Sequence, residues 1–124
     1  MKKVLISYAN QRYHDSQVNL YHTALEIGGV DESIAYTDEW LKTTDFWKKN
    51  SFILSRPRGA GYWIWKPYII LETFKNLKDG DIVLYSDAGL SVIGNLNPLF
   101  EIADTNPNGG IMLFQIPDGH FINT

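Results

Sequence analysis

The fold is decided by the stretch Asp81-Ile82-Val83-Leu84-Tyr85-Ser86-Asp87-Ala88-Gly89, in which an apolar run ends in a carboxylate and two small residues. Because apolar residues point to both faces of such a strand, the run predicts a central strand of a parallel sheet. A carboxylate at the carboxyl end of a strand is poorly placed for packing and well placed to contact a ligand. The alternative for Asp87 is a structural role, in which its side chain closes an Asx-turn with its own backbone.

Strands and helices alternate along the rest of the chain. Further apolar runs predict strands at residues 4–7, 33–37 and 111–116. Helical spacing predicts helices at about residues 15–25, 45–54, 67–77 and 98–102, with a turn or short helix at 38–41. This alternation predicts a single α/β domain over residues 1–124, with a mainly parallel, Rossmann-like sheet flanked by helices.

The first and last of these helices carry specific expectations. Asp15 or Ser16 is expected to cap the first helix, because either side chain can accept a hydrogen bond from the free N–H groups. Its apolar face is expected to consist of Val18, Tyr21 and Leu25, with Ala24 beside them. Asn97 is expected to cap the last helix in the same way.

The composition narrows the class of protein. With 124 residues, 44% hydrophobic and 20% charged, the chain has the mix of one globular domain, not of a disordered, collagenous or coiled-coil protein. Its net charge of −3 argues against a nucleic-acid partner. The absence of cysteine excludes disulfides, a thiol nucleophile and a cysteine-built zinc site. No apolar run approaches the roughly 18 residues of a membrane span, and no signal peptide is recognisable, so a cytoplasmic location is expected.

Aromatic residues are frequent, at 14% of the chain. Their rings bury a large area per residue, so packing in the core is the default interpretation. Aromatic rings also stack on the C–H faces of sugars, which makes carbohydrate binding the alternative.

The candidate site is expected at one edge of the sheet. In open α/β sheets, ligands bind beyond the carboxyl ends of the strands, where the strand order reverses. Three loops follow predicted strands in this way, at residues 8–13, 37–38 and 87–91.

Two motifs carry a resemblance to a known family. Residues 81–100 look like the central segment of GT-A nucleotide-sugar glycosyltransferases of the glycogenin and galactosyltransferase kind, in which an apolar strand ends in Asp-X-Asp and a pattern like Asn-Leu-X-X-Leu-Phe follows. Upstream, Tyr62-Trp63-Ile64-Trp65-Lys66-Pro67 resembles the Tyr-Trp-X-Trp-Lys-Pro element of capsular-polysaccharide-type transferases. The resemblance implies transfer of a hexose from a nucleotide sugar, most simply a UDP-sugar, to a saccharide or other hydroxyl acceptor.

The resemblance also implies roles for single residues. Asp87 matches the first Asp of Asp-X-Asp, which in the family contacts the donor ribose and a divalent metal, Mn²⁺ or Mg²⁺. Gly89 stands where the second Asp is expected, which weakens the metal site because hard cations prefer several oxygen ligands. Ser86 belongs to the same donor-binding motif. Lys66 resembles the family lysine that reaches the donor, where its charge would offset that of the leaving diphosphate; its alternative is a solvated surface lysine.

The loop at residues 8–13, called the first loop, and the loop at residues 56–61 supply the remaining candidates. Tyr8, Asn10 and Tyr13 match in position the element that holds the nucleotide base, with a tyrosine stacking on uracil and the asparagine bonded to its edge. Arg56 and Arg58 flank a loop and could clamp a diphosphate, or serve only as surface charges.

The chain is short for a GT-A domain and resembles its N-terminal half, so the domain is apparently truncated. Such a domain is expected to leave an apolar edge uncovered and to form a homodimer.

Two alternatives to a transferase remain. With Gly89 in place of an acid, the chain could be a nucleotide- or sugar-binding module without catalysis and not a transferase. A flavodoxin-like domain in another role is disfavoured, because residues 7–13 contain no Gly and no Thr for a phosphate loop.

Overall fold

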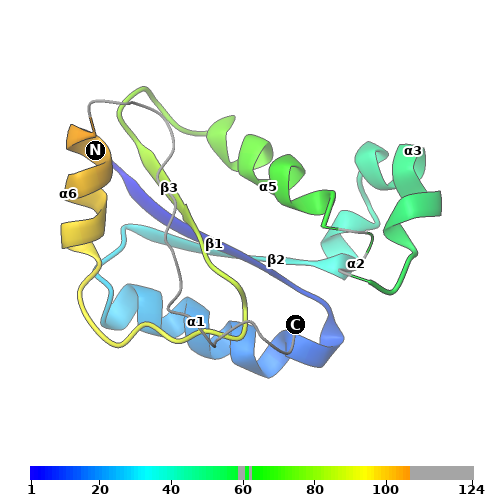
Figure 1. Ribbon diagram of the computed structural model, residues 1–124, viewed down its shortest axis with the longest axis horizontal. Coiled ribbons are helices and arrows are strands. Elements are labelled where there is room, and N and C mark those ends of the chain that lie inside the picture. Colours follow the sequence, from blue (N-terminus) through cyan, green and yellow to red (C-terminus); the bar gives the residue numbers. More distant parts are fainter. Residues whose placement is uncertain (59–60, 62, 107–124) are drawn as a thin grey trace.

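The computed structural model describes residues 1–58, 61 and 63–106. Within these residues the chain forms three parallel strands, β1 (Lys3–Ala9), β2 (Glu32–Thr37) and β3 (Ile82–Tyr85), in the order β2-β1-β3. Figure 1 shows helices on both sides of this sheet. The predicted α/β class with a parallel sheet is therefore confirmed, and the arrangement is compatible with a Rossmann-like fold.

Five α-helices and one 3-10 helix are described. They are η1 (Gln11–Tyr13), α1 (His14–Glu26), α2 (Asp38–Leu41), α3 (Asp45–Leu54), α5 (Trp65–Phe74) and α6 (Asn97–Thr105). The expected elements at 33–37, 38–41 and 45–54 are confirmed. None of these described helices has the length and apolar character needed to cross a membrane. The predicted strand at residues 111–116 and the aromatic Tyr62 lie outside the described residues.

The core forms two layers, one on each face of β1. Val4, Ile6 and Tyr8 point to one face and pack under α5, α3 and α2. Leu5 points to the other face and packs against α1 and α6, where Leu20 is fully buried. This alternation follows from the period of two along a strand.

Among the three strands that the structure describes, β1 lies in the middle. Within the described part of the sheet, β3 pairs with β1 alone, through the register Leu5↔Leu84, and all four of its residues are half-buried. Residues 4–9 of β1 are instead buried without interruption. Among the described strands β1 therefore has a partner on each side and β3 has one. The expectation of a central strand at residues 81–86 stays a prediction, because the strand expected at residues 111–116 lies outside the described residues.

The first helix differs from its prediction at its start and on its buried face. Asn10 caps η1 by accepting a hydrogen bond from Arg12 N at 3.1 Å, and the chain runs directly from η1 into α1, so neither Asp15 nor Ser16 is the cap. The buried face contains Gln17 with Leu20 and Ala24, while Val18 is 42% exposed. Gln17 is buried because its amide donates hydrogen bonds to Ser7 Oγ at 3.2 Å and to the Tyr36 carbonyl at 2.7 Å.

The last described helix also begins differently. Asn97 is its first helical residue and does not cap it. Asn95 Oδ1 accepts from Asn97 N at 2.7 Å, and the Asn97 side chain accepts from the Lys3 ammonium. The cap prediction was therefore wrong, because Asn97 is used to tie α6 to the beginning of β1.

Candidate ligand-binding site

The carboxyl ends of β1 and β3 meet at one edge, where the strand order reverses. From β1 the chain crosses to β2 on one side of β1, and later returns to place β3 on the other side. A cavity of about 600 Å³, named here the edge pocket, opens beyond these ends. It is lined by Tyr8, Ala9, Asn10, Arg12, Tyr13, Pro57, Trp63, Trp65, Tyr85, Asp87, Ala88 and Gly89. Its position agrees with the rule for ligand sites in open α/β sheets.

The edge pocket brings together five of the predicted residues from two distant segments. Tyr8, Asn10 and Tyr13 come from the end of β1, and Asp87 and Gly89 come from the turn after β3. The third expected loop, at residues 37–38, does not line it. That loop lines a neighbouring cavity of about 210 Å³, which shares Ala9 and Asn10 with the edge pocket.

Stacked aromatic rings form the floor of the edge pocket. Tyr8 and Trp65 stack with their centroids 4.1 Å apart, and Trp65 lies 6.2 Å from the ring of Tyr85. Tyr8 is 7% exposed, so its ring belongs to the floor. Burial, with a smaller contribution from the Asp38 carboxylate, raises the pKa of Tyr8 to about 12. Tyr13 is 45% exposed and is the more accessible of the two predicted tyrosines.

Asp87 occupies the turn that closes the pocket after β3. The Tyr85 hydroxyl donates a hydrogen bond to Asp87 Oδ1 at 3.3 Å, while the Asp87 carbonyl accepts from Leu90 N at 3.1 Å and from the Ser86 hydroxyl at 3.3 Å. Among residues 86–91, all of which are described, no backbone N–H bonds to the carboxylate, so the Asx-turn alternative does not apply. Asp87 is an exposed residue, and its carboxylate is held at the pocket by the hydroxyl of Tyr85, which belongs to β3.

Tyr85 connects Asp87 with Lys66. The Lys66 ammonium lies 4.7 Å from the centroid of the Tyr85 ring and 6.0 Å from that of Trp65, within the range of cation–π attraction. Burial raises the pKa of Tyr85, and the nearby Asp87 carboxylate raises it further. The hydroxyl therefore stays protonated and can keep donating to Asp87.

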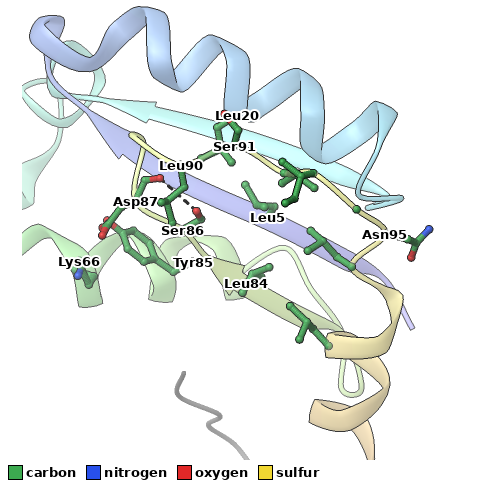
Figure 2. A pocket seen from close by; sticks show the side chains of 15 residues that line it. Leu5, Leu20, Lys66, Leu84, Tyr85, Ser86, Asp87, Leu90, Ser91 and Asn95 are labelled. Atoms are coloured by element: carbon green, nitrogen blue, oxygen red, sulfur yellow. Dashed lines mark hydrogen bonds between the residues drawn. The ribbon is translucent and has the colours of Figure 1, made fainter. Parts of the chain in front are cut away.

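Lys66 reaches this region from the adjoining side of Tyr85. Figure 2 shows Lys66, Tyr85, Ser86 and Asp87 around a second, mainly apolar cavity of about 530 Å³, which continues along β3 past Leu84. Within the described residues Lys66 makes no ion pair. The contacts of its ammonium that the structure describes are with the rings of Tyr85 and Trp65.

The structure places a different arginine in the edge pocket. Arg58 is not among its lining residues, and the Arg56 guanidinium lies over Phe52 of α3, 4.6 Å from the ring centroid. Arg12 lines the pocket and lies over Tyr13, 5.5 Å from its centroid. Arg12 belongs to the first loop that was expected to hold a ligand, so its loop position was the signal that could have identified it.

Trp63 and Tyr85 were also not expected as site residues. Trp63 lies in the Tyr-Trp-X-Trp-Lys-Pro element, and Tyr85 directly precedes Ser86 and Asp87. Both motifs were recognised, but which of their aromatic rings reach the pocket depends on how the segments pack.

A metal at this site would have one carboxylate from the described residues. No group of three His, Asp or Glu side chains gathers anywhere in residues 1–58, 61 and 63–106. A Cβ at Gly89 would have no atom within 4 Å, so the turn has room for a ligand there. Asp87 fits the role of a single anchor for Mg²⁺ that a diphosphate already carries, since Mg²⁺ is commonly held by one or two carboxylates plus substrate phosphates.

Comparison with known proteins adds no relative. The chain matches no protein-family model, and neither a curated protein nor a solved structure is significantly similar to it.

Proposed function

We propose that the chain is the donor-binding part of a nucleotide-sugar glycosyltransferase with a GT-A-like fold. The supporting observation is the convergence in the edge pocket of three segments, the first loop, the residues before α5 and the turn after β3. The two motifs that resemble this family supply the second and third of these segments. The convergence lies at the point of the sheet where such ligands bind.

Each candidate has a chemical role in the proposed reaction. An acceptor hydroxyl oxygen bonds to the anomeric carbon of the donor hexose, and the bond from that carbon to the phosphate oxygen breaks. The electron pair of the broken bond leaves with the diphosphate, and the hydroxyl proton passes to that leaving group or to water. Lys66 offsets the negative charge on that leaving group. Tyr13 stacks on the base, Asn10 hydrogen-bonds to its edge, and Asp87 holds the ribose.

A divalent cation would add positive charge at the diphosphate when bound. Asp87 is the described residue that would hold it. A single carboxylate binds a free divalent cation weakly, so the cation is expected to bind together with the donor diphosphate. Mg²⁺ or Mn²⁺ should therefore raise the affinity for the donor, while the protein alone binds either ion weakly.

The principal test is calorimetric titration of the protein with UDP, with Mg²⁺ and with a chelator. Lys66→Met keeps the apolar stem and removes the charge. A charge-assisted contact contributes about 1.5–3 kcal/mol, so its loss should weaken UDP binding by about tenfold or more. Lys49→Met, in an exposed position on α3, is the matched control and should bind as the native protein does. Absence of UDP binding, or equal binding by both variants, would overturn the proposal.

A binding module without catalysis is the second candidate, and Gly89 in place of an acid favours it. It predicts the same UDP titration but no release of UDP when a UDP-hexose is incubated with acceptors. Measured transfer to an acceptor would exclude this second candidate.

A further inference from the structure

Trp63 has a backbone conformation that bulky residues seldom adopt. Its φ is +60°, and within the described residues it is the sole non-glycine residue with positive φ. Nearby Gly61 has φ +99°, where glycine meets the same requirement without strain. Strained backbone conformations of this kind cluster at active sites and ligand clamps.

Packing does not explain why this position carries a tryptophan. Trp65, two residues further, is buried and stacks on Tyr8. Trp63 is 48% exposed, and its ring stacks on no other ring in the part of the chain that the structure describes. Its carbonyl accepts the hydrogen bond from Lys66 N at 3.0 Å that begins α5, a role that needs only backbone. About half of the Trp63 residue surface therefore stays open to solvent, and the residue lines the edge pocket.

The other groups of the pocket indicate what the indole contacts. A carboxylate from Asp87, a guanidinium from Arg12 and an amide from Asn10 line the same cavity. Together they offer donors and acceptors for the hydroxyls of a sugar, and an indole offers a flat apolar surface for its C–H face. A nucleobase is the competing ligand, but Tyr13 of the first loop already provides an open ring for it.

We propose that Trp63 is the stacking platform for a pyranose ring of the acceptor, which makes the acceptor a saccharide. The role of this sugar as the acceptor rests on the proposed function, whereas the binding of a pyranose by Trp63 does not. Trp63 lines the same pocket as the first loop and the turn after β3, which hold the donor in the proposed function, so an acceptor sugar stacked on it would lie beside that donor.

The test is an NMR titration that follows the indole N–H of Trp63 in the full chain. The probes are lactose, maltose and N,N′-diacetylchitobiose, with glycerol as a hydroxyl compound that lacks a ring, and UDP in a separate series. The proposal expects at least one disaccharide to shift this signal in a saturable way, while glycerol does not and UDP shifts it less. A larger shift with UDP would assign Trp63 to the base and overturn the proposal, as would no shift with all three disaccharides.

Two variants separate binding from folding. Trp63→Gly and Trp63→Asn remove the indole and suit positive φ, so relief of strain offsets part of the lost packing. Both should remain folded, as checked by cooperative thermal unfolding, yet bind disaccharides at least tenfold more weakly. Phe52→Ala, which removes a 75% exposed aromatic ring outside the edge pocket, is the control and should bind normally. Unchanged disaccharide binding in Trp63→Gly would refute the role of Trp63 as a stacking platform.

The two proposals can fail separately. Disaccharide shifts without UDP binding would support the platform and reject the transferase. UDP binding without disaccharide shifts would support the donor site and reject the platform.

Discussion

Gly61 allows the strongest quantitative test, because it fixes the segment that leads to Trp63 and α5. A Cβ at Gly61 would lie 2.5 Å from Leu54 Cα and 3.0 Å from the Ile53 carbonyl oxygen. Both are backbone atoms of α3 and its end, so neither can rotate away. Gly61→Ala therefore forces two backbone segments apart in addition to straining a residue at φ +99°.

Gly80→Ala separates these two effects. Gly80 has a comparable φ of +93°, but a Cβ there would have nothing within 4 Å. Left-handed strain costs about 1–2 kcal/mol in both variants, and overpacking adds about 1–3 kcal/mol only at Gly61. Alanine also lowers the conformational entropy of the unfolded chain, which favours the folded state by a similar amount in both variants and cancels in the comparison. Gly61→Ala should thus lose about 2 kcal/mol more than Gly80→Ala.

Urea unfolding followed by circular dichroism measures this difference. With a denaturant slope of about 1–3 kcal/mol per molar for a small protein, the midpoint of Gly61→Ala should lie about 1 M below that of Gly80→Ala. Equal midpoints, or a higher midpoint for Gly61→Ala, would show that Gly61 does not pack against α3 as described.

Three further outcomes are expected. The free energy of unfolding should fall above pH 10, because an unfolded tyrosine ionises there while Tyr8 stays protonated up to about pH 12; the slope reaches about 1.4 kcal/mol per pH unit for each such group, and urea titrations should find it reduced in Tyr8→Phe. Gly89→Asp has room for its side chain and should raise Mn²⁺ affinity at Asp87 by tenfold or more in calorimetry, without loss of stability. Light scattering at high protein concentration should show a dimer, since large apolar side chains such as Ile93, 93% exposed, lie on the surface.

The controls for these outcomes are direct. A slope in Tyr8→Phe equal to that of the native protein would contradict the raised pKa of Tyr8. Gly89→Ala, measured in Ca²⁺-free buffer, should bind Mn²⁺ with the affinity of the native protein. A gain in Mn²⁺ affinity as large as that of Gly89→Asp would show that the added carboxylate is not the cause. A monomer at every concentration would reject the dimer.

Local chemistry accounts for the elements that were predicted well. Thr44 accepts a hydrogen bond from Trp47 N at 3.1 Å, so the start of α3 is set within a few residues. The turn before β3 has Gly80 at φ +93°, a conformation that glycine adopts freely. The apolar runs that became β1 and β2 needed no information from outside their own segments.

Errors arose where a distant partner decides the outcome. The buried face of α1 contains Gln17 because Ser7 and Tyr36 satisfy its amide, and periodicity of apolar residues cannot register such a partner. Asn97 is drawn away from capping by Lys3, which is 94 residues away in the chain. Both cases are tertiary contacts that override a local preference.

The sequence by itself determined the α/β alternation, the parallel strands and the segments whose loops meet at one edge of the sheet, because periodicity and the carboxyl-edge rule are properties of each segment. Only the tertiary structure decided that Tyr8 lies in the floor under Trp65 while Trp63 and Arg12 reach the edge pocket. The reason is that a ring stacks or stays exposed according to what packs against it. That neighbour comes from another strand or helix and is invisible in the local order of residues.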